Sequence, residues 1–157
     1  MTATLRPTDG TDLETVLRLR LAFVAEFREL APDDLAPEFV DATRAYLVDV
    51  EARDRIRSWV AELDGDPVGL VSVLTEDAPP LPEELRAREG YIVNMYVAPV
   101  ARKQGLARRL LQATLDAAPE EGWRRIYLYA TDAGRPLYDQ TGFASDDRWM
   151  SLRLPFE

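Results

Sequence analysis

A short basic stretch around one glycine is the part of the sequence best suited to binding phosphates. It consists of Arg102, Lys103, Gln104, Gly105, Leu106 and Ala107. A run of β-forming residues precedes it and leucines at helical spacing follow it, so the pattern predicts a turn between a strand and a helix. The start of a helix presents unpaired N–H groups and partial positive charge, and both attract anions. We expect a pyrophosphate to bind here, although the same residues also fit an ordinary strand-to-helix turn.

A second stretch, residues 131–143, follows another predicted strand and contains Leu137, Tyr138, Gly142 and Phe143. A tyrosine hydroxyl can donate a proton or a hydrogen bond to a leaving atom that gains negative charge. Taken by itself, Tyr138 fits better a packed ring whose hydroxyl is satisfied by a neighbour.

Together the two stretches resemble the motifs of the GNAT (Gcn5-related N-acetyltransferase) superfamily. The order Arg102-x-x-Gly105-x-Ala107 resembles its acyl-CoA-binding pattern, Gln/Arg-x-x-Gly-x-Gly/Ala. Residues 131–143 resemble Asn-x-x-Ala-x-x-Leu-Tyr-x-x-x-Gly-Phe, with Thr131 and Gly134 in place of Asn and Ala. The resemblance covers residues 91–143, and neither the Walker A nor the Rossmann glycine pattern is present.

The resemblance implies a mixed α/β fold, a mostly antiparallel sheet with helices on both faces and two parallel strands, 91–97 and 123–130, that splay apart. It implies that pantetheine enters the splay and bonds to the backbone near Met95 and Val97, close to the hydroxyl of Thr131. It also implies that Tyr138 protonates the departing thiolate as an acetyl group moves from acetyl-CoA to an amine. Because the chain has no cysteine, we expect direct transfer in a ternary complex.

The base that would deprotonate the amine is not evident. The chain has no histidine, and the predicted strands 91–97 and 123–129 hold no carboxylate. Alternation along the first of them places Asn94 with Ile92 and Tyr96, so we expect Asn94 to face the cleft as a hydrogen-bond partner. Carboxylates elsewhere are candidates for the acceptor side, and water is an equal alternative. These candidates are Glu26, Glu89, Asp33 and Asp34.

The remaining elements follow from periodicity and turn residues. We expect strands over residues 3–6, 57–63, 68–74, 91–97, 123–130 and 148–154. Helices are expected over residues 13–30, 37–52, 104–118 and 135–141, the first with a capping box from Thr11 to Glu14. Residues 64–67 predict a hairpin turn, and residues 76–90 a surface connection.

Composition and charge narrow the class of protein. A chain of 157 residues with 46% apolar residues predicts one domain over residues 1–157, and the absence of a long apolar run predicts a cytoplasmic protein without a membrane partner. The absence of histidine and cysteine argues against a metal site, and the negative charge argues against nucleic acid as a partner. The net charge is −9, and its acidic excess lies in residues 1–90. That excess fits either an ordinary solvated surface or an anionic surface that favours a cationic amine, which is a small molecule or a peptide. A homodimer stays open. Two alternatives remain: a GNAT-like domain that binds acyl-CoA without turnover, and an α/β partner-binding domain with no CoA site.

Overall fold

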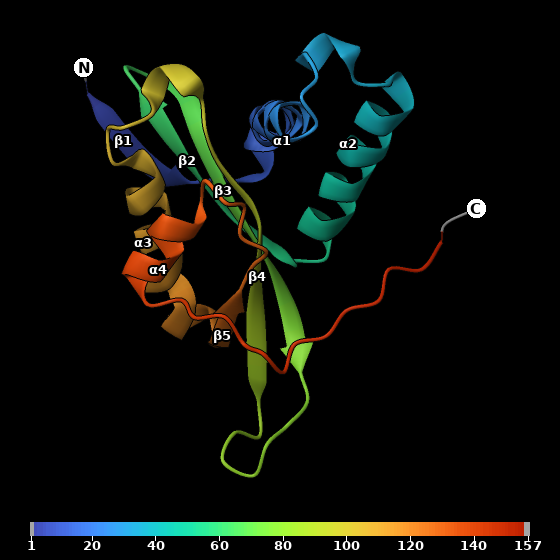
Figure 1. The fold of residues 1–157 in the computed structure, drawn as a ribbon, viewed down its shortest axis with the longest axis vertical. Coiled ribbons are helices and arrows are strands. Elements are labelled where there is room, and N and C mark those ends of the chain that lie inside the picture. The colour runs from blue at the N-terminus through green and yellow to red at the C-terminus, as the bar shows by residue number, and fades with distance from the viewer. Residues whose placement is uncertain (1, 156–157) are drawn as a thin grey trace.

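The computed structural model describes residues 2–155 as a five-stranded sheet with helices on both faces (Figure 1). The strands are β1 (Ala3–Pro7), β2 (Ile56–Leu63), β3 (Asp66–Ala78), β4 (Ala87–Val97) and β5 (Trp123–Tyr127). The helices are α1 (Leu13–Phe27), α2 (Pro37–Ala52), α3 (Leu106–Glu121) and α4 (Arg135–Thr141). Neighbouring strands β1 to β4 are antiparallel and β4 is parallel to β5, which confirms the predicted mixed α/β class.

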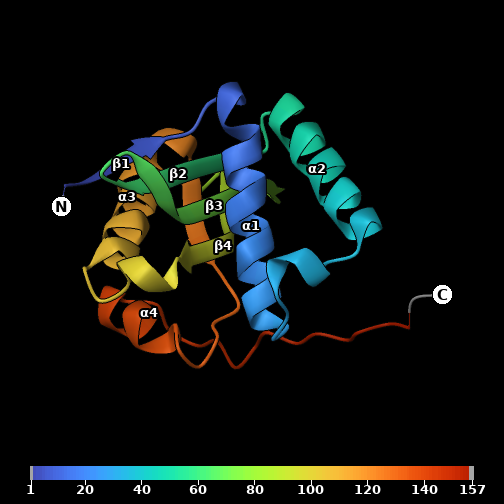
Figure 2. The same cartoon turned by 90° about the horizontal axis from the view of Figure 1, so that it is seen from above.

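The sheet separates two hydrophobic clusters. Helices α1 and α2 cover one face, and α3 and α4 cover the other (Figures 1 and 2). Leu17 and Leu47 pack with Val60 on the first face, whereas Leu110 of α3 packs with Val71 on the second. The core therefore fixes β4 between two layers of helices, and its ends are where loops can form a site.

A β-bulge interrupts the pairing of β3 with β4. Ser72 pairs with Asn94 and the next residue, Val73, pairs with Ile92, so Val93 is the extra residue. A bulge reverses the alternation of side chains beyond it. Tyr96 accordingly lies in the α1/α2 cluster while Ile92 lies in the α3 cluster. The prediction that Ile92, Asn94 and Tyr96 share one face is thus wrong for Ile92.

The parallel strands splay apart as predicted. Their pairing covers only residues 88–91 of β4, and its last pair is Tyr91 with Tyr127. Residues 92–97 of β4 continue without a partner on that side. The strand expected over residues 123–130 consequently ends at Tyr127, because beyond it the neighbouring backbone is out of reach.

Several predicted boundaries are corrected. Residues 76–90 are only partly a connection, because β3 extends to Ala78 and β4 begins at Ala87. Helix α1 ends at Phe27 and α3 runs from Leu106 to Glu121, where Gly122 takes a left-handed conformation that ends it. The two-residue turn at Asp64 and Gly65, both with positive φ, confirms the predicted hairpin.

The strand expected over residues 148–154 is absent: these residues have no regular secondary structure. The side chain and carbonyl of Asp146 instead accept hydrogen bonds from Arg148 N and Trp149 N, which forms a local turn. An alternating pattern makes a strand only where a sheet edge pairs with it. No helix in residues 2–155 has the length and apolarity needed to cross a bilayer.

The expected capping box begins two residues earlier, at Asp9 rather than Thr11. The carboxylate of Asp9 accepts from Thr11 N, and that of Asp12 accepts from Asp9 N at 2.9 Å. Asp12 is buried and receives two hydrogen bonds from Arg6, at 2.8 and 2.9 Å. These bonds select Asp12 over Glu14 as the acidic partner.

We expect Asp12→Ala to lower the free energy of unfolding by about 1.5–3 kcal/mol, the usual effect of losing hydrogen bonds to a charged group. Arg6 lowers the pKa of Asp12, so this stabilisation is present above the ordinary carboxyl pKa and disappears as the pH falls below it. Urea unfolding at neutral and acid pH measures both effects. An unchanged midpoint at neutral pH would show that the ion pair contributes nothing.

Candidate active site

The splay leaves one edge of β4 open. Ala98 N donates to Val68 O at 2.7 Å, so this pair is hydrogen-bonded across β3 and β4. Hydrogen-bonded and non-hydrogen-bonded pairs alternate in antiparallel strands. The backbone groups of Met95 and Val97 therefore point away from β3, toward the open edge. An extended amide-containing chain can pair with such an edge as a strand would.

The turn before α3 is open to an anion. Lys103 and Gly105 have φ values of 61° and 77°, and Gly105 precedes the helix without a capping side chain. Among residues 2–155, no acceptor is found for the backbone N–H groups of residues 103–107. A Cβ built on Gly105 would meet nothing within 4 Å, so the space before the helix is free. These features fit a pyrophosphate bound to backbone amides.

Side chains of the same turn have different surroundings. Lys103 and Gln104 are exposed, whereas Leu106 is buried and can offer only its amide. Ala107 is half-buried and, like Gly105, brings little bulk near the turn. The turn thus presents backbone donors with one flexible cation, Lys103, beside them.

Arg102 connects this turn to α1. Its Nε donates to Val97 O at 2.8 Å, and its Nη2 donates to both carboxylate oxygens of Glu26, each at 2.7 Å. Its guanidinium lies 6.0 Å from the centre of the Tyr96 ring. Glu26, a predicted candidate for the acceptor side, is therefore ion-paired beside the turn.

Tyr138 is buried in the cluster against which Met95 packs. Its ring meets Phe143 edge-on, with centroids 5.6 Å apart. Its hydroxyl has no hydrogen-bond partner within residues 2–155, and burial raises the pKa of Tyr138 to about 12. The hydroxyl therefore stays protonated at physiological pH and can donate.

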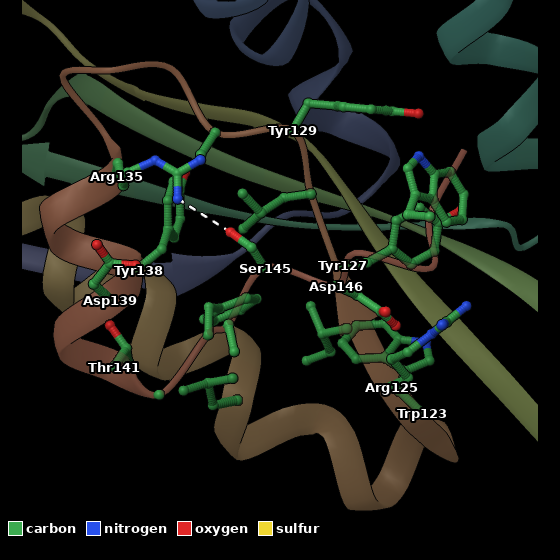
Figure 3. A pocket seen from close by; sticks show the side chains of 18 of the residues that line it. Trp123, Arg125, Tyr127, Tyr129, Arg135, Tyr138, Asp139, Thr141, Ser145 and Asp146 are labelled. Atoms are coloured by element: carbon green, nitrogen blue, oxygen red, sulfur yellow. Dashed lines mark hydrogen bonds between the residues drawn. The ribbon is translucent and has the colours of Figure 1, made fainter. Parts of the chain in front are cut away.

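The loop before α4 and the pocket around Tyr138 complete this side. Thr131 Oγ1 accepts from Gly134 N at 3.1 Å, so its hydroxyl holds the turn that leads into α4. A pocket of about 650 Å³ lies between β5, α3 and α4. Figure 3 shows Tyr138 on its α4 side and Trp123 and Tyr127 on its β5 side.

The other predicted acceptor residues do not come together. Glu89 lies at the far end of β4, where it pairs with Arg125 at 2.8 Å and Arg124 at 3.5 Å. Asp33 and Asp34 are exposed in a short turn between α1 and α2. Asn94 is buried on the α1/α2 face and is the one member of this set placed next to Met95.

Sequence reasoning missed Arg20. This residue of α1 donates from Nη1 to Val93 O at 3.1 Å and to Asn94 Oδ1 at 2.9 Å. Its position follows Val16 and Leu17 at helical spacing, so a charge stands within the buried stripe of the helix. That interruption of an apolar stripe was the available signal.

The sequence of this chain matches a known protein family over most of its length. The model of the family described as "Acetyltransferase (GNAT) family" matches residues 18–143, which is most of the chain. The chain belongs to the GNAT acetyltransferase family. The match includes the open edge of β4, the turn before α3 and Tyr138.

Solved GNAT structures have the same architecture. A GCN5-related N-acetyltransferase from Ralstonia eutropha is 30% identical and superposes with a TM-score of 0.78 over 98% of this chain and 99% of its own. A predicted acetyltransferase from Clostridium acetobutylicum, crystallised with acetyl-CoA, is 25% identical with a TM-score of 0.82, over 97% and 96%.

Among curated proteins, the mouse "Probable N-acetyltransferase family 8 member 5" is 26% identical over 142 residues, which are 88% of this chain. The chain spans 59% of the length of that protein and smaller shares of the other curated relatives that it matches.

Proposed function

We propose that this GNAT protein is an N-acetyltransferase that moves an acetyl group from acetyl-CoA to an amine by direct transfer in a ternary complex. Three features of residues 2–155 support the proposal: backbone amides at residues 103–107 without an acceptor, an open edge on β4, and a Tyr138 hydroxyl without a hydrogen-bond partner. The crystallised relative from Clostridium acetobutylicum held acetyl-CoA, which supports that donor.

Each element has a separate task. Acetyl-CoA, when bound, supplies the reactive thioester. The amides of residues 103–107 and Lys103 would hold the pyrophosphate, and the backbone of Met95 and Val97 would align the pantetheine. Tyr138 would donate its proton to the sulfur as the carbon–sulfur bond breaks. Its raised pKa keeps that proton available.

The acceptor reaches this centre from the α1/α2 face. Glu26 is ion-paired with Arg102 beside the turn, and Glu89 is ion-paired with Arg125 at the far end of β4. We propose that water carries this proton to bulk solvent. The acidic excess of residues 1–90 supports an acceptor that arrives as an ammonium ion, because an anionic surface concentrates cations.

The alternative function is acyl-CoA binding without turnover. The ion pair of Glu26 with Arg102 favours it, because this carboxylate beside the turn already has a cationic partner, while Glu89 lies at the far end of β4. The retained Tyr138 favours an enzyme, since a hydroxyl with no partner has no evident structural task.

The test combines affinity with turnover. Calorimetry with CoA and thiol release from acetyl-CoA, measured with a panel of amines, should give micromolar binding and amine-dependent release. CoA binding without thiol release for any amine would support acyl-CoA binding without turnover. Absence of CoA binding would contradict both proposals.

A further inference from the structure

A second cavity lies on the α1/α2 face, separate from the pocket around Tyr138. It encloses about 340 Å³ between α1, α2 and β4. Phe39, Leu47 and Ile56 give it apolar walls, and Tyr46 lies at its margin. Arg20 is its one charged lining residue.

The charge of Arg20 has no counter-ion within residues 2–155. Both of its hydrogen bonds leave from Nη1 and go to neutral oxygens, Val93 O and Asn94 Oδ1. No carboxylate of the described chain forms an ion pair with it, in contrast to Arg6 and Arg102. Burial lowers the pKa of Arg20, yet a guanidinium stays charged at physiological pH. Arg20 is half-buried and its Nε and Nη2 are not closed off from solvent, so an anionic ligand can replace the water that hydrates them.

The geometry of the guanidinium defines the missing anion. With Nη1 engaged, the edge formed by Nε and Nη2 has no acceptor among residues 2–155. Two parallel N–H groups on one edge match the two oxygens of a carboxylate. The ring of Phe23, 5.6 Å from the guanidinium carbon, restrains the group from one side.

The cavity adjoins the proposed acetyl site. Val93 and Asn94 line it, and the next residue along β4 is Met95, whose backbone faces the open edge. A molecule anchored at Arg20 would therefore extend toward the thioester from the face opposite Tyr138. The bulge at Val93 creates this link, because it turns a β4 carbonyl toward Arg20.

We propose that Arg20 binds the carboxylate of the acceptor, and that the acceptor is an amino acid with an apolar side chain. This inference rests on the proposed function. The apolar walls would receive the side chain, and a cavity of this volume is at the small end of the range for ligand sites. An amino acid is a zwitterion, so the acidic surface of residues 1–90 attracts its ammonium group while Arg20 binds its carboxylate.

The test compares apolar α-amino acids with their α-amides, which keep the amine and the side chain but lose the anion. In the wild type, kcat/KM should be about 10- to 100-fold higher for the acid, as expected for charge-assisted hydrogen bonds. Arg20→Gln should abolish this preference by lowering kcat/KM for the acid and leaving that for the amide within about threefold.

Arg18→Gln is the matched control, since Arg18 lies on the same helix, is exposed and forms one side-chain hydrogen bond within residues 2–155, to Pro67 O. It should leave the preference unchanged. The dissociation constant for acetyl-CoA should be the same in all three proteins. If Arg20 had only a structural role, Arg20→Gln would lower kcat/KM equally for the acid and the amide, or would weaken acetyl-CoA binding. Either result overturns the proposal.

Binding measured by NMR in the CoA-loaded protein separates this inference from the proposed function. Arg20-dependent binding of the acid without turnover would support the carboxylate site and contradict acetyl transfer. Equal kcat/KM for acid and amide, or no binding of any acid at about 10 mM, would overturn the carboxylate site whether or not other amines are acetylated.

Discussion

Gly105→Glu should abolish binding of acetyl-CoA. The φ of 77° at Gly105 and the open space before it allow a pyrophosphate to reach the amides of residues 103–107. A glutamate side chain would occupy that space, repel the phosphates and compete for the same amides. Loss of two or more charge-assisted hydrogen bonds predicts a dissociation constant raised about 100-fold or more, measured by calorimetry.

Gly122→Glu provides a matched control at the other end of α3. Its φ of 73° is also left-handed, and a Cβ there would also meet nothing within 4 Å. Both variants should therefore lose about 1 kcal/mol of stability through backbone strain. Only the change at Gly105 should affect acetyl-CoA. Unchanged affinity in a folded Gly105→Glu protein would remove the pyrophosphate site from this turn.

Tyr138→Phe should lower kcat by about 10²–10⁴, the usual effect of a positioned proton donor. The substitution keeps the ring and its edge-on contact with Phe143, so the fold and the affinity for acetyl-CoA should persist. Steady-state kinetics at saturating donor measure the loss. Tyr127→Phe is the control, because it removes a hydroxyl that donates to Glu76 at 2.6 Å. A decrease in the Tyr138 variant as small as in this control would mean that water protonates the thiolate.

The raised pKa of Tyr138 makes a second, independent prediction. With a pKa of about 12, the hydroxyl keeps its proton where an ordinary tyrosine, near 10, begins to lose it. The kcat of the wild type should therefore show no decrease from this group below about pH 11. The unfolded chain loses this proton first, so the contribution of Tyr138 to stability is complete below about pH 10 and declines as the pH rises toward 12. A decrease of kcat with a midpoint near pH 10 that is absent in Tyr138→Phe would contradict the raised pKa of Tyr138, although it would leave Tyr138 as the proton donor.

The two motifs could be predicted from the sequence because they are local. The turn of residues 102–107 needs only a strand, a glycine and a helix in order, and the structure contains them in that order. The segment that carries Tyr138 also forms a helix from Arg135 to Thr141, as expected. Patterns of neighbouring residues determine such features, since the backbone conformation and the side-chain period both act over a few residues.

Two features that depend on pairing between strands could not be predicted. Nothing in the composition of residues 91–97 marks Val93 as a bulge, yet that bulge separates Ile92 from Asn94 and Tyr96. Residues 148–154 alternate like a strand but lie beside no edge that binds them. Strand pairing is a contact between distant segments, so a single segment cannot specify it.

The sequence by itself determined the sheet-and-helix class, the turn before α3 and the short helix that carries Tyr138. Only the tertiary structure decided which charges are neutralised. It pairs Glu26 with Arg102 across 76 positions of sequence, and it places Arg20 against β4 with no ion pair to any carboxylate of residues 2–155. The reason is that the energy of a charge depends on burial and on partners brought together by folding, and neither is a property of its neighbours in the chain.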